Sequence, residues 1–268
     1  MMLTDNSDTF LVPEDAESLL GIPALGYIPT IDEESLRLIR DVSTFSPLVE
    51  SFRSLRTNLR FVAEQPLRSL AIVSAVPAEG KSTALANLAM ALAMEGKRVI
   101  VVDGDLRRPT QHKLFKRDAS PGLVDVLVGT HEISDVLRPS GVDNVSVIPA
   151  GTNPTNPTEL LGLLAMEHLV AELEKRCDIV LLDTSPLLVV ADGMLVASLA
   201  KGVLVVVGQG ETKKINVQKT MSLLARARAT VLGAVFNRVG MPDRKVYGKY
   251  YVPSESPDDK DDKADEAP

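Results

Sequence analysis

Tryptophan is absent from this 268-residue sequence, and cysteine occurs only once, at Cys177. A single cysteine excludes an internal disulfide framework and any metal or iron–sulfur site built from several cysteines of one chain. Aromatic residues are also scarce, at 4%, whereas hydrophobic residues make up 45%, so aliphatic side chains must form most of the core. Aliphatic packing of this kind is usual where helices cover a parallel sheet.

The sequence also lacks an apolar run of about 18 residues and an N-terminal secretion signal, so we expect no membrane-spanning helix within it. A broad positive charge is missing as well. The net charge is -7, and residues 252–268, with seven acids and two lysines, account for most of the excess. Because the remaining residues are near neutral, they offer no field that would attract nucleic-acid phosphates. We therefore expect no nucleic-acid partner.

Six apolar, β-rich runs alternate with helix-length segments from residue 69 onward. These runs lie at 69–75, 98–103, 145–149, 178–183, 203–208 and 230–236. They are continuously apolar, which is typical of strands buried on both faces of a parallel sheet. Before them, Ser46 and Pro47 predict the start of a helix with one apolar stripe. The pattern predicts an α/β fold of the P-loop NTPase type, a mostly parallel sheet flanked by helices on both faces.

The segment SAVPAEGKST, residues 74–83, joins the first of these strands to a helix. It departs from the pattern G-x-x-x-x-G-K-[ST] at its first glycine, where Ala75 stands, and the alternative is a chance GKS on an ordinary turn. Strand, turn and helix together favour a phosphate-binding loop. Lys81 would then reach the β and γ phosphates and Ser82 would bind Mg²⁺. The loop residues expected to contact nucleotide are Ala78, Glu79, Gly80, Lys81, Ser82 and Thr83.

Two later strands end in aspartates. VIVVDGDLRRP carries Asp103 and Asp105, and CDIVLLDTSP carries Asp183. Near one magnesium ion, one carboxylate could hold the metal and another could accept a proton from an attacking hydroxyl. Solvated acids in a strand-end turn are the alternative, and the phosphate loop favours the functional interpretation. Which of Asp103 and Asp105 would be the base stays open.

Taken together, SAVPAEGKST, VIVVDGDLRRPTQHKLF, GLVDVLVG, IPAGTNPTNPTELL and DIVLLDTSP resemble the bacterial tyrosine kinases, the cytoplasmic ATP-binding domains of polysaccharide co-polymerases. The resemblance covers about residues 13–251. It implies ATP and Mg²⁺ as cofactors, and it implies that Lys81, Asp103 and Asp105 are catalytic. The implied metal ligands are Ser82, Asp103, Asp105 and Asp183, and Asn237 is implied near adenine. Ser185 interrupts the DTPP that is usual in this family.

Two further features match the family. One is the E-x-x-R-x-x-R element of the family, which serves self-association into a ring and is matched here by Glu50, Arg53 and Arg56 in VESFRSLRTNL. The alternative interpretation is a solvated helix face with an internal ion pair. Three of the four tyrosines fall within KVYGKYY, where the family has its autophosphorylated cluster. The resemblance implies that the phosphate acceptors are Tyr247, Tyr250 and Tyr251.

The sequence thus predicts a leader at 1–45 that resembles a post-membrane segment, a P-loop kinase domain at 46–240, and a tyrosine-bearing, acidic, disordered tail at 241–268. The predicted function is ATP-dependent tyrosine autophosphorylation between neighbouring subunits, regulating export or chain length of a surface polysaccharide. The expected location is the cytoplasmic face of the plasma membrane, with a membrane-spanning co-polymerase activator, fused or separate, as partner. The alternative functions are a partner-positioning ATPase of the Min or Par type and a nucleotide-binding scaffold. ATPases of the Min or Par type carry an extra lysine near the start of the loop, where this sequence has Val76.

Overall fold

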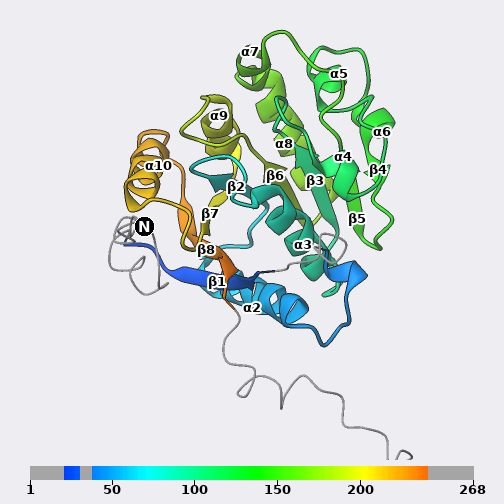
Figure 1. Cartoon of the computed structure of the whole chain (residues 1–268). Coiled ribbons are helices and arrows are strands. Elements are labelled where there is room, and N and C mark those ends of the chain that lie inside the picture. Colours follow the sequence, from blue (N-terminus) through cyan, green and yellow to red (C-terminus); the bar gives the residue numbers. More distant parts are fainter. Residues whose placement is uncertain (1–20, 31–37, 241–268) are drawn as a thin grey trace, which may run out of the picture.

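A computed structural model describes residues 21–30 and 38–240. Within them, eight strands form one sheet in the order β1-β8-β7-β2-β6-β3-β5-β4 (Figure 1). Neighbouring strands are parallel except for the antiparallel pair β4 and β5. The strands are β1 (Ala24–Pro29), β2 (Ser69–Ser74), β3 (Val99–Asp103), β4 (Arg138–Pro139), β5 (Val145–Ile148), β6 (Ile179–Asp183), β7 (Gly202–Gly208) and β8 (Val231–Val239).

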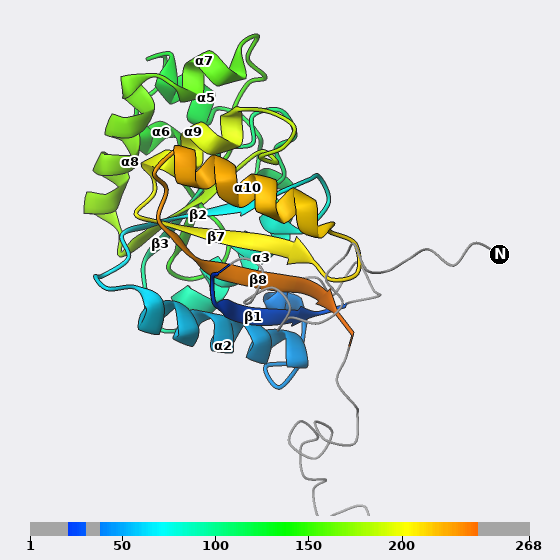
Figure 2. The ribbon, with the colours of Figure 1, turned by 90° about the vertical axis from the view of Figure 1, so that its left-hand side faces the viewer.

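Helices cover both faces of this sheet, which confirms the predicted fold class. One face packs against η3 (Ile39–Asp41), α2 (Pro47–Val62), α3 (Lys81–Ala93) and α4 (Gln111–Leu114). The other packs against α5 (Leu123–Leu127), α6 (Ile133–Val136), α7 (Pro157–Leu161), α8 (Leu164–Arg176), α9 (Asp192–Leu199) and α10 (Lys214–Arg226). Figure 2 shows α2 and α10 on opposite sides of the strands. No helix in the described ranges is long and apolar enough to cross a membrane.

Helix α2 begins where the sequence predicts it. The Ser46 hydroxyl accepts a hydrogen bond from the Val49 backbone N–H at 3.3 Å, and Pro47 occupies the first turn, where its missing N–H costs no hydrogen bond. Phe52 and Leu55 on its inner face are fully buried. A Cβ at Gly26 of β1 would lie 3.2 Å from the Cβ of Leu55, so the glycine permits close packing of helix on strand.

Strand β1 lies in the region predicted as a leader, where no strand was expected. It pairs in parallel with β8 at one edge of the sheet. Pro23 precedes this short strand and Pro29 is its last residue, which obscures its strand character in the sequence, although an edge position tolerates them. The short strand β4 was also not predicted. Residues 1–20 and 31–37 of the predicted leader lie outside the described residues, as does the tail at 241–268.

The sheet register decides where the predicted site residues meet. Strands β2 and β3 lie on either side of β6, and all three run parallel. Asp103 at the end of β3 pairs in register with Asp183 at the end of β6. Because β2 ends at the same edge of the sheet, the loop that follows it enters α3 beside these two aspartates.

Candidate active site

The phosphate loop folds as the sequence predicts, between β2 and α3. Gly80 caps α3 with φ +90°, a conformation that favours glycine, and a Cβ there would collide with the side-chain nitrogen of Asn237. That nitrogen donates a hydrogen bond to the Glu79 carbonyl at 2.9 Å. The end of β8 therefore supports the loop from one side, which places Asn237 next to the predicted nucleotide site.

Glu79 is itself part of this support. Its carboxylate accepts hydrogen bonds from the Val76 N–H at 2.9 Å and from the Thr212 hydroxyl. Burial raises the pKa of Glu79, and these hydrogen bonds oppose the rise. The Glu79 side chain thus fastens the loop to the segment before α10, so only its backbone remains available to a phosphate.

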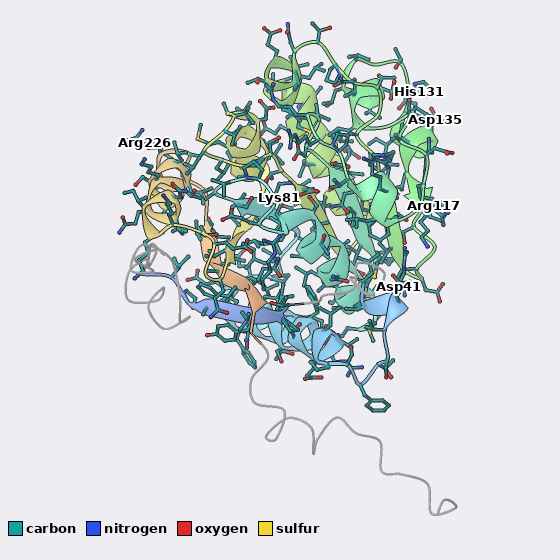
Figure 3. All side chains as sticks on the ribbon, viewed as in Figure 1. Asp41, Lys81, Arg117, His131, Asp135 and Arg226 are labelled. Atoms are coloured by element: carbon teal, nitrogen blue, oxygen red, sulfur yellow. The ribbon has the colours of Figure 1, made fainter. Side chains whose placement is uncertain are left out.

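Lys81 lies at the centre of the site, at the start of α3 (Figure 3). Its Nζ is 3.1 Å from Asp105 Oδ2, 3.4 Å from Asp183 Oδ1 and 3.1 Å from the Ser82 hydroxyl. Burial alone would lower the pKa of Lys81, but the charges of Asp183 and Asp105 outweigh it and hold the pKa above its ordinary value. The lysine is therefore a fully charged cation at neutral pH.

Asp103 is completely buried beside this lysine. Its Oδ2 accepts hydrogen bonds from the backbone N–H groups of Thr110 and Gln111, both at 2.9 Å. Its Oδ1 has no hydrogen-bond partner within the described part of the chain. Burial first, and then the charge of Asp183, raise the pKa of Asp103 well above its ordinary value.

Asp105 has different surroundings, because both of its oxygens are engaged. Oδ2 faces Lys81, whereas Oδ1 accepts from the Ser185 hydroxyl at 2.9 Å and from the Arg108 N–H at 3.1 Å. Ser185 is the residue at which the sequence departs from the family pattern. A proline there would have no hydroxyl to donate, so this departure gives Asp105 an additional hydrogen bond.

Gln111 is a site residue that the sequence did not indicate. Its side chain is fully buried, and Nε2 donates to Asp183 Oδ2 at 2.8 Å and to the Ser82 carbonyl at 3.1 Å. One residue thus contacts the ends of β3 and β6 and the start of α3. Nothing in the local sequence marks it, because its partners are distant along the chain.

The site residues fit a magnesium ion held together with a nucleotide. No group of three or more His, Cys, Asp or Glu side chains in the described ranges forms a metal cage by itself. Mg²⁺ is usually held by one or two carboxylates together with phosphate oxygens and waters, so a cage is not required. The Ser82 hydroxyl, the nearby carboxylates and the unpartnered oxygen of Asp103 provide the hard oxygen ligands that this ion prefers.

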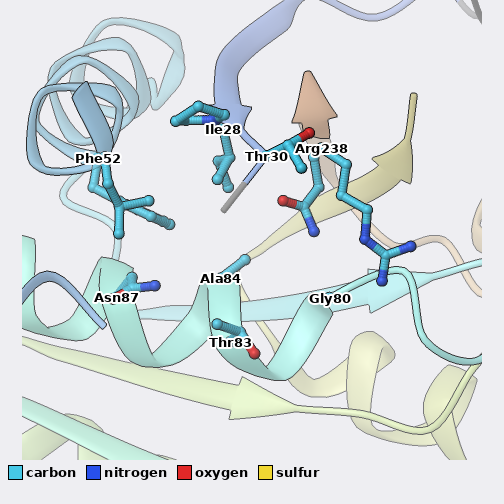
Figure 4. A pocket seen from close by; sticks show the side chains of 11 residues that line it. Ile28, Thr30, Phe52, Gly80, Thr83, Ala84, Asn87 and Arg238 are labelled. Atoms are coloured by element: carbon cyan, nitrogen blue, oxygen red, sulfur yellow. The ribbon is translucent and has the colours of Figure 1, made fainter. Parts of the chain in front are cut away.

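A pocket of about 160 Å³ lies on the other side of α3 (Figure 4). It is bounded by the ends of β1 and β8 and by α2 and α3. Its lining includes Ile28, Thr30, Phe52, Gly80, Thr83, Ala84, Asn87, Asn237 and Arg238. The Arg238 guanidinium also donates to the Ala78 carbonyl at 2.6 Å. The pocket thus adjoins the phosphate loop and combines apolar walls with a few polar groups, which is typical of small-molecule sites.

The three residues of the predicted self-association element lie on α2 but make different contacts. Glu50 and Arg53 form an ion pair at 3.5 Å. Arg56 instead points to α3, where it donates to the Ala91 carbonyl at 2.7 Å and lies 3.8 Å from Glu95. The predicted acceptors Tyr247, Tyr250 and Tyr251 are outside the described residues.

Known proteins are similar to this chain in sequence and in fold. The AAA domain family matches residues 69–224. Tyrosine-protein kinase YwqD of Bacillus subtilis is 36% identical over 202 residues, covering 75% of this chain and 85% of YwqD. Putative tyrosine-protein kinase EpsB of Ralstonia nicotianae is 33% identical, covering 89% of this chain but 34% of EpsB.

A solved structure supports the same assignment. The kinase domain of the Escherichia coli tyrosine kinase ETK superposes with a TM-score of 0.79 at 29% identity, covering 87% of this chain and 96% of that domain. The likeness thus covers most of this chain. The chain belongs to the bacterial tyrosine-protein kinases.

Proposed function

We propose that this kinase transfers the γ-phosphate of ATP to Tyr247, Tyr250 and Tyr251 in the tail of a neighbouring copy. The observation that carries the proposal is the contact of Lys81 with Asp105 and Asp183 at the start of α3. It gathers a phosphate-binding cation and two carboxylates at the mouth of a phosphate loop. Asp103, in register with Asp183, adds a third carboxylate.

The chain's own residues would divide the work as follows. The backbone N–H groups at the start of α3 and the charge of Lys81 bind the phosphates and stabilise the charge that develops during transfer. Ser82, Asp103, Asp105 and Asp183 would hold Mg²⁺, which would further neutralise the phosphate charge. The base of the nucleotide would occupy the pocket beside Asn237, whose side chain also holds the loop through the Glu79 carbonyl.

The tyrosine proton would go to Asp103 or Asp105. Their surroundings give the two carboxylates different properties, since Asp105 is hydrogen-bonded through both oxygens, whereas one oxygen of Asp103 has no partner among the described residues. Asp103→Asn and Asp105→Asn therefore separate the roles. The base is the residue whose replacement abolishes transfer while the affinity for Mg-ATP, measured by calorimetry, stays within about twofold. Replacement of a metal ligand would instead reduce both the phosphate transfer and the affinity for Mg-ATP.

A mixing experiment tests transfer between copies. The acceptor is the full chain with Lys81→Met, and the enzyme is the full chain with Tyr247→Phe, Tyr250→Phe and Tyr251→Phe. We expect phosphate on the acceptor's tail only when both proteins and Mg-ATP are present. Each protein alone is the control. Absence of transfer in the mixture, with normal phosphorylation of the unmodified chain, would contradict transfer between copies.

Self-association through the Glu50 and Arg53 face is part of the proposal. The ion pair on α2 leaves both side chains partly exposed, so they remain accessible to another copy. We expect Glu50→Lys with Arg53→Glu, a swap that preserves an internal pair, to reduce the mass measured by light scattering. Glu64→Lys, an exposed change just beyond α2, is the control. An unchanged mass for the swap would exclude this face as an interface.

We also propose that the kinase acts at the cytoplasmic face of the plasma membrane with a membrane-spanning co-polymerase activator, in regulating a surface polysaccharide. Two facts support this. Residues 13–29 resemble a segment that follows a membrane helix, and the chain matches about a third of the longer relative EpsB. Fusing or co-expressing such a membrane segment should increase tail phosphorylation several-fold in cells, as measured by anti-phosphotyrosine blotting.

A further inference from the structure

We propose that the basic segment at 106–117 is the docking surface for the acidic tail, residues 252–268, of a neighbouring copy. This inference rests on the proposed transfer to tail tyrosines and names how the enzyme would recognise that substrate. The segment LRRPTQHKLFKR has five lysines and arginines and no acid. It directly follows the predicted catalytic aspartates, so its position as well as its charge carries the argument.

The inner side of the basic segment forms a wall of the active site. The backbone N–H of Arg108 binds Asp105, and those of Thr110 and Gln111 bind Asp103. The Gln111 side chain reaches further, to Asp183. Helix α4, within the segment, packs beside α3, where Lys81 lies (Figure 1). A peptide bound on the outer side would therefore lie at the rim of the phosphate-transfer site.

The outer side carries cations that nothing in the described chain neutralises. The side chains of Arg108, Lys113 and Lys116 are exposed and form no hydrogen bond or ion pair within the described ranges. The other two cations are engaged, because Arg107 pairs with Asp192 at 2.6 Å and Arg117 donates to the Pro139 carbonyl. Within the described ranges, three positive charges thus remain available to a partner.

Two acids of the described ranges that adjoin this segment are paired with other cations. Asp118, the first acid after the segment, pairs with Arg138 at 3.4 Å. Asp41 lies near Arg40, whose guanidinium donates to the Leu114 carbonyl at the end of α4. In the described ranges, both of these acids are thus paired with arginines outside the segment.

The tail has the complementary composition. Residues 252–268 contain seven acids and two lysines, and they follow the three tyrosines directly. Glu255, the first of these acids, is four residues beyond Tyr251, a span of about 13 Å in an extended chain. Attraction between exposed charges extends over about 8 Å at physiological salt, which increases the rate of encounter and sets the orientation of binding. An acidic segment docked at the rim would hold the tyrosines within reach of the site.

The test again uses two full-length chains, a Tyr-less enzyme and a Lys81→Met acceptor. With Lys113→Gln and Lys116→Gln in the enzyme, we expect the KM for the acceptor to rise about fivefold, while the Kd for Mg-ATP stays unchanged. Adding Arg108→Gln should increase the effect. Lys201→Gln with Lys219→Gln, two exposed lysines away from this segment, is the matched control. Glu255→Gln, Asp258→Asn and Asp259→Asn in the acceptor should raise the KM similarly.

The pairing of the two surfaces is tested by combining both sets of changes. If the lysines and the acids contact each other, the rise in KM of the combined variants will be smaller than the product of the two separate rises. The rise in KM caused by each set of changes will also become smaller as the salt concentration increases. Independent effects on KM, or an acceptor KM that the lysine changes do not alter, would overturn the docking proposal without contradicting the proposed kinase activity. Failure of the unmodified pair to transfer phosphate would instead overturn the proposed function. Lysine-dependent binding to phosphatidylserine-rich vesicles, with an unchanged acceptor KM, would assign the surface to a membrane and also overturn the proposal.

Discussion

The amine of Lys81 lies 3.1 Å from Asp105 Oδ2. The cation expected to bind phosphate is thus held by a carboxylate two residues beyond the end of β3. Both side chains are almost completely buried. A charge pair removed from water in this way is costly to break, because the remaining partner is left uncompensated. The contact therefore links nucleotide binding to the stability of the site.

Replacement of the lysine tests this link. We expect Lys81→Met to reduce phosphate transfer at least about 100-fold and to lower the free energy of unfolding by about 3 kcal/mol, because two carboxylates lose their cation. Adding Asp105→Asn should restore part of the stability but none of the activity. Urea unfolding and a phosphate-transfer assay measure the two effects, with exposed Lys97→Met as the control. A variant as stable as the unmodified chain would contradict a structural role for the pair.

Gln111 should act as a positioning residue. Its amide holds Asp183 and the Ser82 carbonyl, so Gln111→Leu removes a support of two predicted metal ligands. We expect Gln111→Leu to raise the Mg²⁺ concentration that gives half-maximal activity about tenfold. The value for Gln111→Asn should lie between those of the unmodified chain and of Gln111→Leu. Gln218→Leu, on the exposed side of α10, is the control. An unchanged Mg²⁺ requirement, with lower activity at saturating Mg²⁺, would show that the amide serves only packing.

Glu79 should make stability depend on pH. Burial raises the pKa of Glu79 in the folded protein above its ordinary value of 4.5, so the folded state binds the proton more tightly than the unfolded state does. The ionised carboxylate therefore reduces stability at pH values above the folded pKa, and this cost disappears as the pH falls toward 4.5. We expect Glu79→Gln to have a higher free energy of unfolding than the unmodified chain at pH 8. This difference in free energy should be smaller at pH 5.

Urea unfolding at the two pH values measures this difference, and exposed Glu64→Gln should show no such pH dependence. A Gln variant that is less stable by the same amount at both pH values would indicate that the hydrogen bonds to Val76 and Thr212 outweigh the burial of charge.

Cys177 should be unreactive in the folded protein. The side chain is buried beside α8, and burial raises the pKa of its thiol to about 11. The thiolate is the reactive form, so little of it exists at pH 8. We expect iodoacetamide to label Cys177 only after unfolding in urea, as followed by mass spectrometry. Rapid labelling of the native chain at pH 8 would show that this region opens readily.

Much of the fold was predictable because its signals are local. The six buried runs, the Ser46 cap and the loop ending in Gly80 each reflect the chemistry of a few consecutive residues. The meeting of Asp103 and Asp183 also followed, because parallel strands that end in aspartate bring those ends to one edge. Strand β1 was not predictable in this way, since the prolines before it and at its end are typical of a loop.

Other parts of the site depend on contacts between distant segments. Gln111 reaches residues 29 and 72 positions away in the sequence, and no local pattern specifies such contacts. The hydrogen bond from Ser185 to Asp105 likewise appears only once β6 and the segment after β3 are placed side by side. The direction of Arg56 toward α3 separates it from Glu50 and Arg53, although helical spacing alone puts all three on one face.

The central claim is tested most directly by incubating the purified full chain with Mg-ATP and mapping covalent phosphate by mass spectrometry, with and without an attached membrane-activator segment. The account predicts phosphate on Tyr247, Tyr250 or Tyr251 and none in the Lys81→Met chain. Release of inorganic phosphate without tyrosine modification in both forms would contradict it and favour an ATPase. Neither product in either form would favour a nucleotide-binding scaffold.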